Sequence, residues 1–267
     1  MSPTATADVP TPPLFELLLR LGDSDLILAQ RLGEWVGKAP AIEEDIALTN
    51  VGLDLLGQAR LWLGYAGEVE EEATGYGRTE DELAFLRDVA EFRNVLLVEQ
   101  PNGNFADTMA RQFLYDQWHV LALEGLARSA DARVAAIAGK ALKEVRYHVE
   151  RSADWVVRLG DGTDESHRRM QGAVDALWMY TGELFMQDAL ERGLVEAGIA
   201  VDVTELVTAW RARVEAVFAE ATLVVPPNPW MQGAQGRGGK QGVHTEHLGH
   251  LLAEMQFLQR AYPGAQW

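Results

Sequence analysis

The sequence predicts an all-α protein organised around a bundle of long helices. Apolar residues recur at intervals of three and four along almost the whole of the 267-residue chain, the spacing that places them on one face of an α-helix. No stretch shows the alternation of apolar and polar residues that is typical of a strand. About half of the residues (48%) are apolar, so the chain can fill the interior of a large bundle.

The first half of the chain is predicted to contribute two long helices and a short one. A Pro-rich lead-in, residues 1–13, is expected to be disordered, and residues 14–267 are expected to form a single domain. Pro40 stands at the entrance of the second helix, where its missing N–H costs nothing. The expected elements are helices over 14–36 and 41–66, an acidic loop with glycines over 67–80, and a shorter helix over 81–93.

The second half begins with a dense turn signal at residues 99–104, after which Asn104 caps a helix and Asp107 resembles the second member of a capping box. A Pro- and Gly-rich stretch, 226–242, cannot hold a regular element. The expected helices cover 104–128, 131–159, 163–197, 202–225 and 245–261. Four long helices with a long connection over 67–104 predict a ferritin-like four-helix bundle with additional C-terminal helices.

Composition and charge exclude several classes of function. The net charge of −17 repels phosphate backbones and anionic lipids, so nucleic acids and membrane surfaces are not expected partners. The chain has no cysteine, which excludes disulfides, thiolate metal sites and cysteine nucleophiles and is compatible with the cytoplasm, the expected location. No apolar run reaches the ~18 residues that span a bilayer, and residues 1–13 lack the features of a secretory signal.

Polar residues form stripes on helices that otherwise read as buried. Burying such groups without partners costs about 1–3 kcal/mol each, so the stripes must face one another, a metal or a partner protein. In chain order, the four stripes are Asp23, Gln30 and Glu34; Asn50, Asp54 and Gln58; Gln112, Asp116 and His119; and Lys140, Glu144, His148 and Arg151.

The stripes do not supply a di-iron carboxylate centre. Such a centre takes a Glu from each of two helices and Glu-x-x-His from each of the other two. Gly57 stands three residues after Asp54, and Tyr147 stands three residues after Glu144, so the pattern is broken twice. We therefore expect a metal-free polar network, with no catalytic, cofactor-binding or metal residue in this chain. The candidates for a degenerate site are Asp54, Asp116, His119, Glu144 and His148.

Two further features of the C-terminal region have metal-like or phosphate-like spacing. His244, His247 and His250 lie at a helix start, and we interpret them as an exposed or interface cluster rather than as metal ligands. The Gly-rich loop 233–242 contains Arg237 and Lys240, but no strand precedes it, as a phosphate-binding loop requires. We expect this loop to be mobile or ordered by a partner.

Five blocks of the chain resemble the C subunits of ring-1,2-phenylacetyl-CoA epoxidases, which are ferritin-like proteins. The similarity extends from about residue 14 to the C-terminus, and phrases such as VEQPNGNFADT and HTEHLG are too long for a chance match. The blocks are LGDSDLILAQRLGEWVGKAP (21–40), DIALTNVGLDLLGQAR (45–60), LLVEQPNGNFADTMARQFLYDQWHV (96–120), KEVRYHVERSADWVVRLGDGTD (143–164) and GKQGVHTEHLGHLLAEMQFLQR (239–260).

The resemblance implies a multicomponent monooxygenase of phenylacetate catabolism. In that family a homologous A subunit holds the di-iron centre and binds phenylacetyl-CoA. A reductase contains FAD and an iron–sulfur cluster and takes electrons from NADPH, and a small B subunit is also present. The C subunit is implied to be a degenerate, non-catalytic partner that supports the A subunit in a heteromer and holds no cofactor itself.

The residues leave two other functions open. One is a ferritin-like di-metal oxygenase with an atypical site built from the degenerate-site candidates. The other is a homo-oligomeric structural protein without a partner. Under the favoured interpretation, deleting residues 233–242 is expected to weaken the complex with the A subunit and leave the bundle folded.

Overall fold

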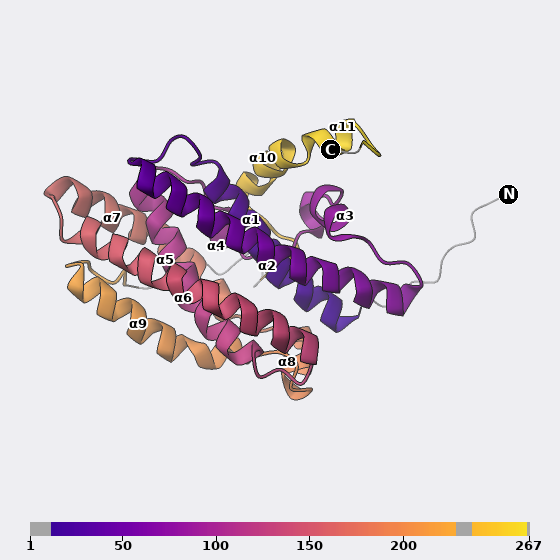
Figure 1. The fold of residues 1–267 in the computed structure, drawn as a ribbon. Helices are drawn as coiled ribbons and strands as arrows, with labels where there is room; N and C mark the ends of the chain where they lie inside the picture. The colour runs from indigo at the N-terminus through magenta and orange to yellow at the C-terminus, as the bar shows by residue number, and fades with distance from the viewer. Residues whose placement is uncertain (1–11, 228–236, 266–267) are drawn as a thin grey trace.

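The computed structural model describes residues 12–227 and 237–265, and Figure 1 shows their arrangement. Four long helices form the centre: α1 (Pro13–Gly33), α2 (Ile42–Thr74), α5 (Phe105–Leu126) and α6 (Ala132–Gly160). Helix α1 packs along α2, α5 packs along α6, and α2 also contacts α6. The described residues contain no strand, which confirms the predicted all-α, ferritin-like bundle.

Local sequence signals set the ends of these helices. Pro13 occupies the first turn of α1, and the expected lead-in otherwise falls mostly on residues outside the described part. Asn104 accepts a hydrogen bond from the Ala106 N–H and forms the predicted capping box with Asp107. Gly75, with φ of 79°, ends α2 in the left-handed conformation that glycine adopts without strain,.

The connection between the two helix pairs differs from the prediction at its start. Helix α2 continues to Thr74, eight residues beyond the predicted end at residue 66. Gly67 lies inside the helix, where its missing side chain makes room for the returning chain. A Cβ at this position would overlap the carbonyl oxygen of Arg78. Arg78 is fixed by an ion pair with Glu70, 2.7 Å long.

The rest of the connection is made of short elements, α3 (Glu80–Phe85), the 3-10 turn η1 (Val89–Glu91) and α4 (Leu96–Glu99). The single helix predicted over 81–93 is therefore wrong. The chain leaves the helix after Phe85 so that Arg87 can reach inward, where its guanidinium pairs with the buried carboxylate of Asp23. A buried ion pair of this kind overrides local helix propensity.

An outer layer covers the pair formed by α5 and α6. It consists of α7 (Asp164–Leu177) and α9 (Leu206–Glu220). Between them the chain forms the 3-10 segment η2 (Trp178–Phe185), α8 (Ala189–Glu196), which contacts α1, and η3 (Val203–Glu205). Helices α7 and α9 both contact α5 and α6. The single helix predicted over 163–197 is wrong, because Asp188 starts a new helix with its own capping box. Among the described residues, no helix is long and apolar enough to cross a membrane.

The C-terminal region forms an arm beside α1 and α3 (Figure 1). It contains η5 (Gly239–Gln241), α10 (Glu246–Met255) and α11 (Phe257–Ala261), where the apolar spacing predicts a single helix over 245–261. Gln256, at the break between α10 and α11, is buried and donates to the carbonyl oxygens of Ala84 and Arg87, both at 3.0 Å. This side chain ties the arm to the connection between the helix pairs.

Candidate functional site: the polar centre of the bundle

The five degenerate-site candidates lie on three of the four central helices. Asp54 is on α2, Asp116 and His119 are on α5, and Glu144 and His148 are on α6. Asp116, His119 and His148 are buried, whereas Glu144 and Asp54 are partly exposed. The structure joins these residues in separate pairs, one of them between His148 and Asp54, and does not gather all five around one point.

Two of the pairs link α2 to α6. Gln58 donates from Nε2 to Oε2 of Glu144 at 2.9 Å. His148 Nε2 lies 3.1 Å from Oδ2 of Asp54, whose side chain is 37% exposed at the rim of the bundle. Gln58 therefore acts as the partner of Glu144, and the i, i+4 pair of Glu144 and His148 splits between two different contacts.

Asp116 is held within its own pair of helices. Gln112 donates to its Oδ1 at 2.7 Å, and the Ser152 hydroxyl donates to its Oδ2 at 2.8 Å. Burial raises the pKa of Asp116 to about 6, although nearby His148 and these two hydrogen bonds lower it. Both carboxylate oxygens of Asp116 therefore have a partner within α5 and α6.

Asp25 is a member of the centre that the polar stripes do not include. It is buried on α1, where Tyr115 donates to its Oδ1 at 3.4 Å and His119 Nε2 lies 3.6 Å away. Burial raises the pKa of Asp25 well above its usual range and lowers the pKa of His119 to about 3. Seven-residue spacing between the buried Leu18, Asp25 and Leu32 is the signal that places it on the core face,.

The stripe predicted on the first helix does not face this centre. Asp23 pairs with Arg87 in the connection between the helix pairs. Glu34 pairs with Arg31 at 2.9 Å and accepts from Asn102 at 2.9 Å. These carboxylates therefore hold the connection against α1, a structural task that the helical spacing alone could not distinguish from a central position.

The residues present do not fit a di-iron group. In the part of the chain that the structure describes, no group of three or more His, Asp or Glu side chains is arranged to hold a metal ion. A di-metal centre needs several ionised carboxylates directed at one point. Here burial favours the neutral form of Asp25, and Gln58 and Gln112 donate hydrogen bonds to the carboxylates of Glu144 and Asp116.

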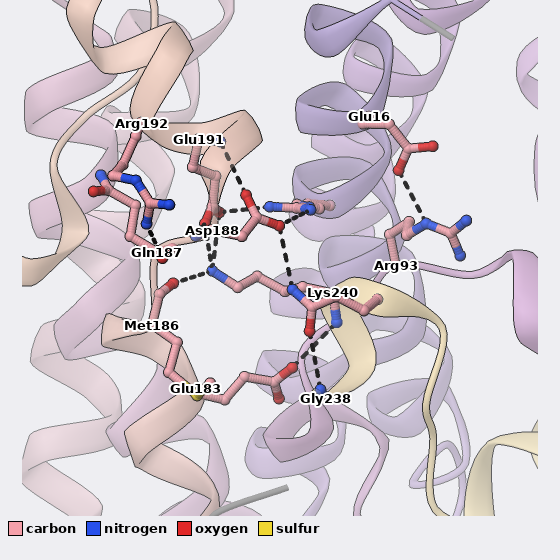
Figure 2. A network of polar contacts seen from close by, with 12 residues as sticks. Glu16, Arg93, Glu183, Met186, Gln187, Asp188, Glu191, Arg192, Gly238 and Lys240 are labelled. Atoms are coloured by element: carbon pink, nitrogen blue, oxygen red, sulfur yellow. Dashed lines mark hydrogen bonds and ion pairs between the residues drawn. The ribbon is translucent and has the colours of Figure 1, made fainter. Parts of the chain in front are cut away.

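A second polar centre lies where the C-terminal arm enters the protein (Figure 2). Lys240 Nζ contacts Oε1 and Oε2 of Glu191 at 2.9 and 3.0 Å and donates to the Met186 carbonyl. Arg20 from α1 pairs with Asp188 at 2.5 Å and with Glu191 at 3.1 Å. Two cations and two carboxylates thus balance one another, and the side chains of Lys240, Arg20 and Glu191 are only 6%, 7% and 9% exposed.

Glu183 fixes the backbone on both sides of this centre. Its Oε2 accepts from the Leu96 N–H at 2.6 Å, and its Oε1 accepts from the Lys240 N–H at 3.1 Å. Gly239 is required for the approach, because a Cβ there would overlap the Asn94 carbonyl oxygen, and a Cβ on Gly238 would displace the Glu183 carboxylate. The expectation of a mobile or partner-ordered loop therefore fails for residues 238–242, while residues 228–236 lie outside the described part.

The predicted histidine cluster is also divided. The His244 side chain is buried, with Nδ1 2.8 Å from Oε2 of Glu99 and Nε2 3.0 Å from the Phe92 carbonyl oxygen. Glu99 also accepts from the N–H and hydroxyl of Thr245 at 2.6 and 2.7 Å. His250 is exposed. His244 therefore anchors the arm within the chain, which corrects its interpretation as an exposed or interface residue.

Comparison with known proteins gives a consistent result. The sequence model of the PaaA_PaaC family, described as phenylacetic acid catabolic protein, matches residues 1–267. The curated C subunit of 1,2-phenylacetyl-CoA epoxidase from Escherichia coli (strain K12) is 55% identical over 249 residues, covering 93% of this chain and 97% of the relative. The epoxidase-family resemblance expected from the sequence blocks is thereby confirmed. The ferritin-like helical chain belongs to the PaaA_PaaC family of phenylacetic acid catabolic proteins.

Proposed function

We propose that the chain is a non-catalytic, structural component of a cytoplasmic, multicomponent 1,2-phenylacetyl-CoA epoxidase. In this proposal it pairs with a homologous catalytic A subunit that holds the di-iron centre, and a B subunit and a reductase complete the system. The name of the 55% identical relative supports membership of such an assembly. A family named for both PaaA and PaaC supports a pair of related subunits.

The observation that carries the non-catalytic role is the occupation of the carboxylates at the bundle centre. Glu144 accepts from Gln58, and both oxygens of Asp116 accept from Gln112 and Ser152. Side chains that hydrogen-bond to one another across α2, α5 and α6 stabilise the bundle without a metal. A rigid homologous bundle is a suitable support for a partner whose own site must be held in place.

The first test measures where the iron resides. The purified chain and the catalytic subunit of the same organism are analysed by elemental mass spectrometry, separately and as a complex, after iron loading. We expect iron to accompany the catalytic subunit and to be near zero in this chain. About two irons per chain would instead favour a ferritin-like oxygenase that uses the five candidate residues.

A substitution at the centre gives the second test. Glu144→Gln preserves a side chain of the same size that can still accept from Gln58, so the fold should persist. We expect the reconstituted complex to keep its rate of phenylacetyl-CoA epoxidation. A loss of about 100-fold or more, the scale on which a catalytic acid or base acts, would overturn the non-catalytic role. A chain that is monodisperse alone and does not bind the catalytic subunit would overturn the pairing.

A further inference from the structure

The long edge of the bundle formed by α1 and α2 carries large apolar side chains on its outer surface. Five of them are between 39% and 73% exposed: Val36 in the turn after α1, and Ile42, Ile46, Leu53 and Leu56 on α2. We call these five residues the apolar edge. Contiguous exposed apolar surface of this kind marks interaction sites in soluble proteins. On the outward face of α6, the exposed residues are mainly charged, including Lys143, Arg146 and Glu150, with the single large apolar side chain of Tyr147 among them.

Helix α2 has two apolar faces where a surface helix needs one. Its inner face buries Leu48, Leu55 and Trp62, seven residues apart, against the bundle. The outer row runs through Ile42, Ile46, Thr49, Leu53 and Leu56, at successive spacings of four, three, four and three. That spacing is the a/d pattern by which one helix packs against another in a coiled coil. The outer row is therefore suited to a partner helix in particular.

A groove beside this row provides space for the side chains of such a helix. It measures about 250 Å³ and lies between α1 and α2, with Val36, Leu53 and Leu56 along its walls. Its remaining lining includes the small residues Ala29, Gly33 and Gly52. A neighbouring hollow includes Ile42 and Ile46 in its lining. Small residues between exposed Leu and Ile side chains form the holes that receive knobs from a facing helix.

Net charge argues against a second copy of this chain as the occupant. Each chain carries a charge of −17, and a large net charge of one sign opposes self-association. A homologous partner offers a bundle of the same architecture, and therefore a long helix of matching length. Such a partner need not carry the same large negative net charge. We propose that the apolar edge binds one long helix of the homologous catalytic subunit, an inference that rests on the pairing proposed above.

The test introduces charge into the edge and compares it with matched changes elsewhere. Ile46→Glu and Leu53→Glu, singly and together, place a carboxylate in the outer row of α2. Val224→Glu and Phe257→Glu are the controls, because these side chains are 69% and 62% exposed outside the apolar edge and add the same charge. Binding of the catalytic subunit is measured by isothermal titration calorimetry, with circular dichroism and thermal unfolding to verify each fold. Hydrogen exchange of residues 42–56 is compared in the free and bound chain.

We expect each edge variant to bind at least about 30-fold more weakly, the effect of losing one interface hot spot. The controls should bind as the parent does, and the amides of residues 42–56 should be protected in the complex. Edge variants that bind like the parent would overturn the surface while leaving the pairing intact. Failure of the parent chain to bind would overturn the pairing itself. If the parent is a dimer in sedimentation equilibrium and Leu53→Glu is a monomer, the occupant is a second copy and the proposal is wrong.

Discussion

Replacing Lys240 tests whether the loop at residues 233–242 is dispensable, as the sequence suggests, or contains a buried ion-pair partner, as the structure shows. The ammonium group of Lys240 lies between the two oxygens of Glu191 and the Met186 carbonyl. Lys240→Met keeps a long apolar stem of similar volume and removes the charge. The remaining cluster then has one cation, Arg20, for the two carboxylates of Asp188 and Glu191.

The expected loss follows from the burial of these groups. Removing one partner from a buried ion pair costs about 3–5 kcal/mol, because the other charge is left uncompensated. Arg20 still contacts Glu191 at 3.1 Å, so we place the loss at the lower end, about 3 kcal/mol. For a chain of this size, such a loss lowers the melting temperature by roughly 6–12 °C. Urea unfolding monitored by circular dichroism and differential scanning calorimetry measure both quantities.

A double variant isolates the ion pair from other effects of the substitution. Glu191→Gln keeps an acceptor for the Asp188 N–H, which Glu191 caps at 3.2 Å. In Lys240→Met with Glu191→Gln, Arg20 and Asp188 remain as a balanced pair, so the double variant should be more stable than additivity predicts by at least about 1.5 kcal/mol. The reasoning is refuted if Lys240→Met lies within about 0.5 kcal/mol of the parent or if the two changes are additive. The same result would revive the expectation that residues 233–242 can be deleted from a folded bundle.

Two further predictions concern single positions. Burial raises the pKa of Asp116 from 3.8 to about 6, so its protonated form is favoured in the folded chain. Protonated Asp116 stabilises the folded chain fully below pH ~4, and this stabilisation is lost as the pH rises through ~6. It amounts to about 3 kcal/mol in all, of which about half is lost between pH 5 and pH 8. The difference in unfolding free energy between the parent and Asp116→Asn should change by this amount in urea titrations at the two pH values, and a difference independent of pH would contradict the assignment. Gly67→Ala should destabilise the chain by about 1–3 kcal/mol, because its Cβ overlaps the Arg78 carbonyl oxygen,. Gly57→Ala, at a helical position with open space around it, should instead stabilise the chain by up to about 1 kcal/mol. Both changes are measured by thermal unfolding, and equal effects would show that the close approach at Gly67 has no cost.

The sequence alone determined the class of the fold and the long central helices. Helical spacing of apolar residues and short-range caps, such as Asn104 with Asp107, depend on neighbours within a few residues, and the structure agrees with both. The same local information fails where distant groups decide the backbone. Gly67 resembles the start of a loop in the sequence, although it is the point where a returning segment of the chain approaches the helix. The break after Phe85 depends on a buried pair between Arg87 and Asp23, which lie 64 residues apart.

For the polar centre, the sequence determined which residue types are present on the inner faces, and the broken spacing at Gly57 and Tyr147 followed directly from it. Only the tertiary structure decided which of them meet. Gln58 with Glu144 and His148 with Asp54 are contacts between helices, about 90 residues apart in the chain,. Asp25 entered the centre, and Lys240 and His244 became buried anchors, because burial and ion pairing depend on what the rest of the fold brings alongside. Helix periodicity specifies the face on which a side chain lies, whereas the identity of its partner is fixed only when the helices pack.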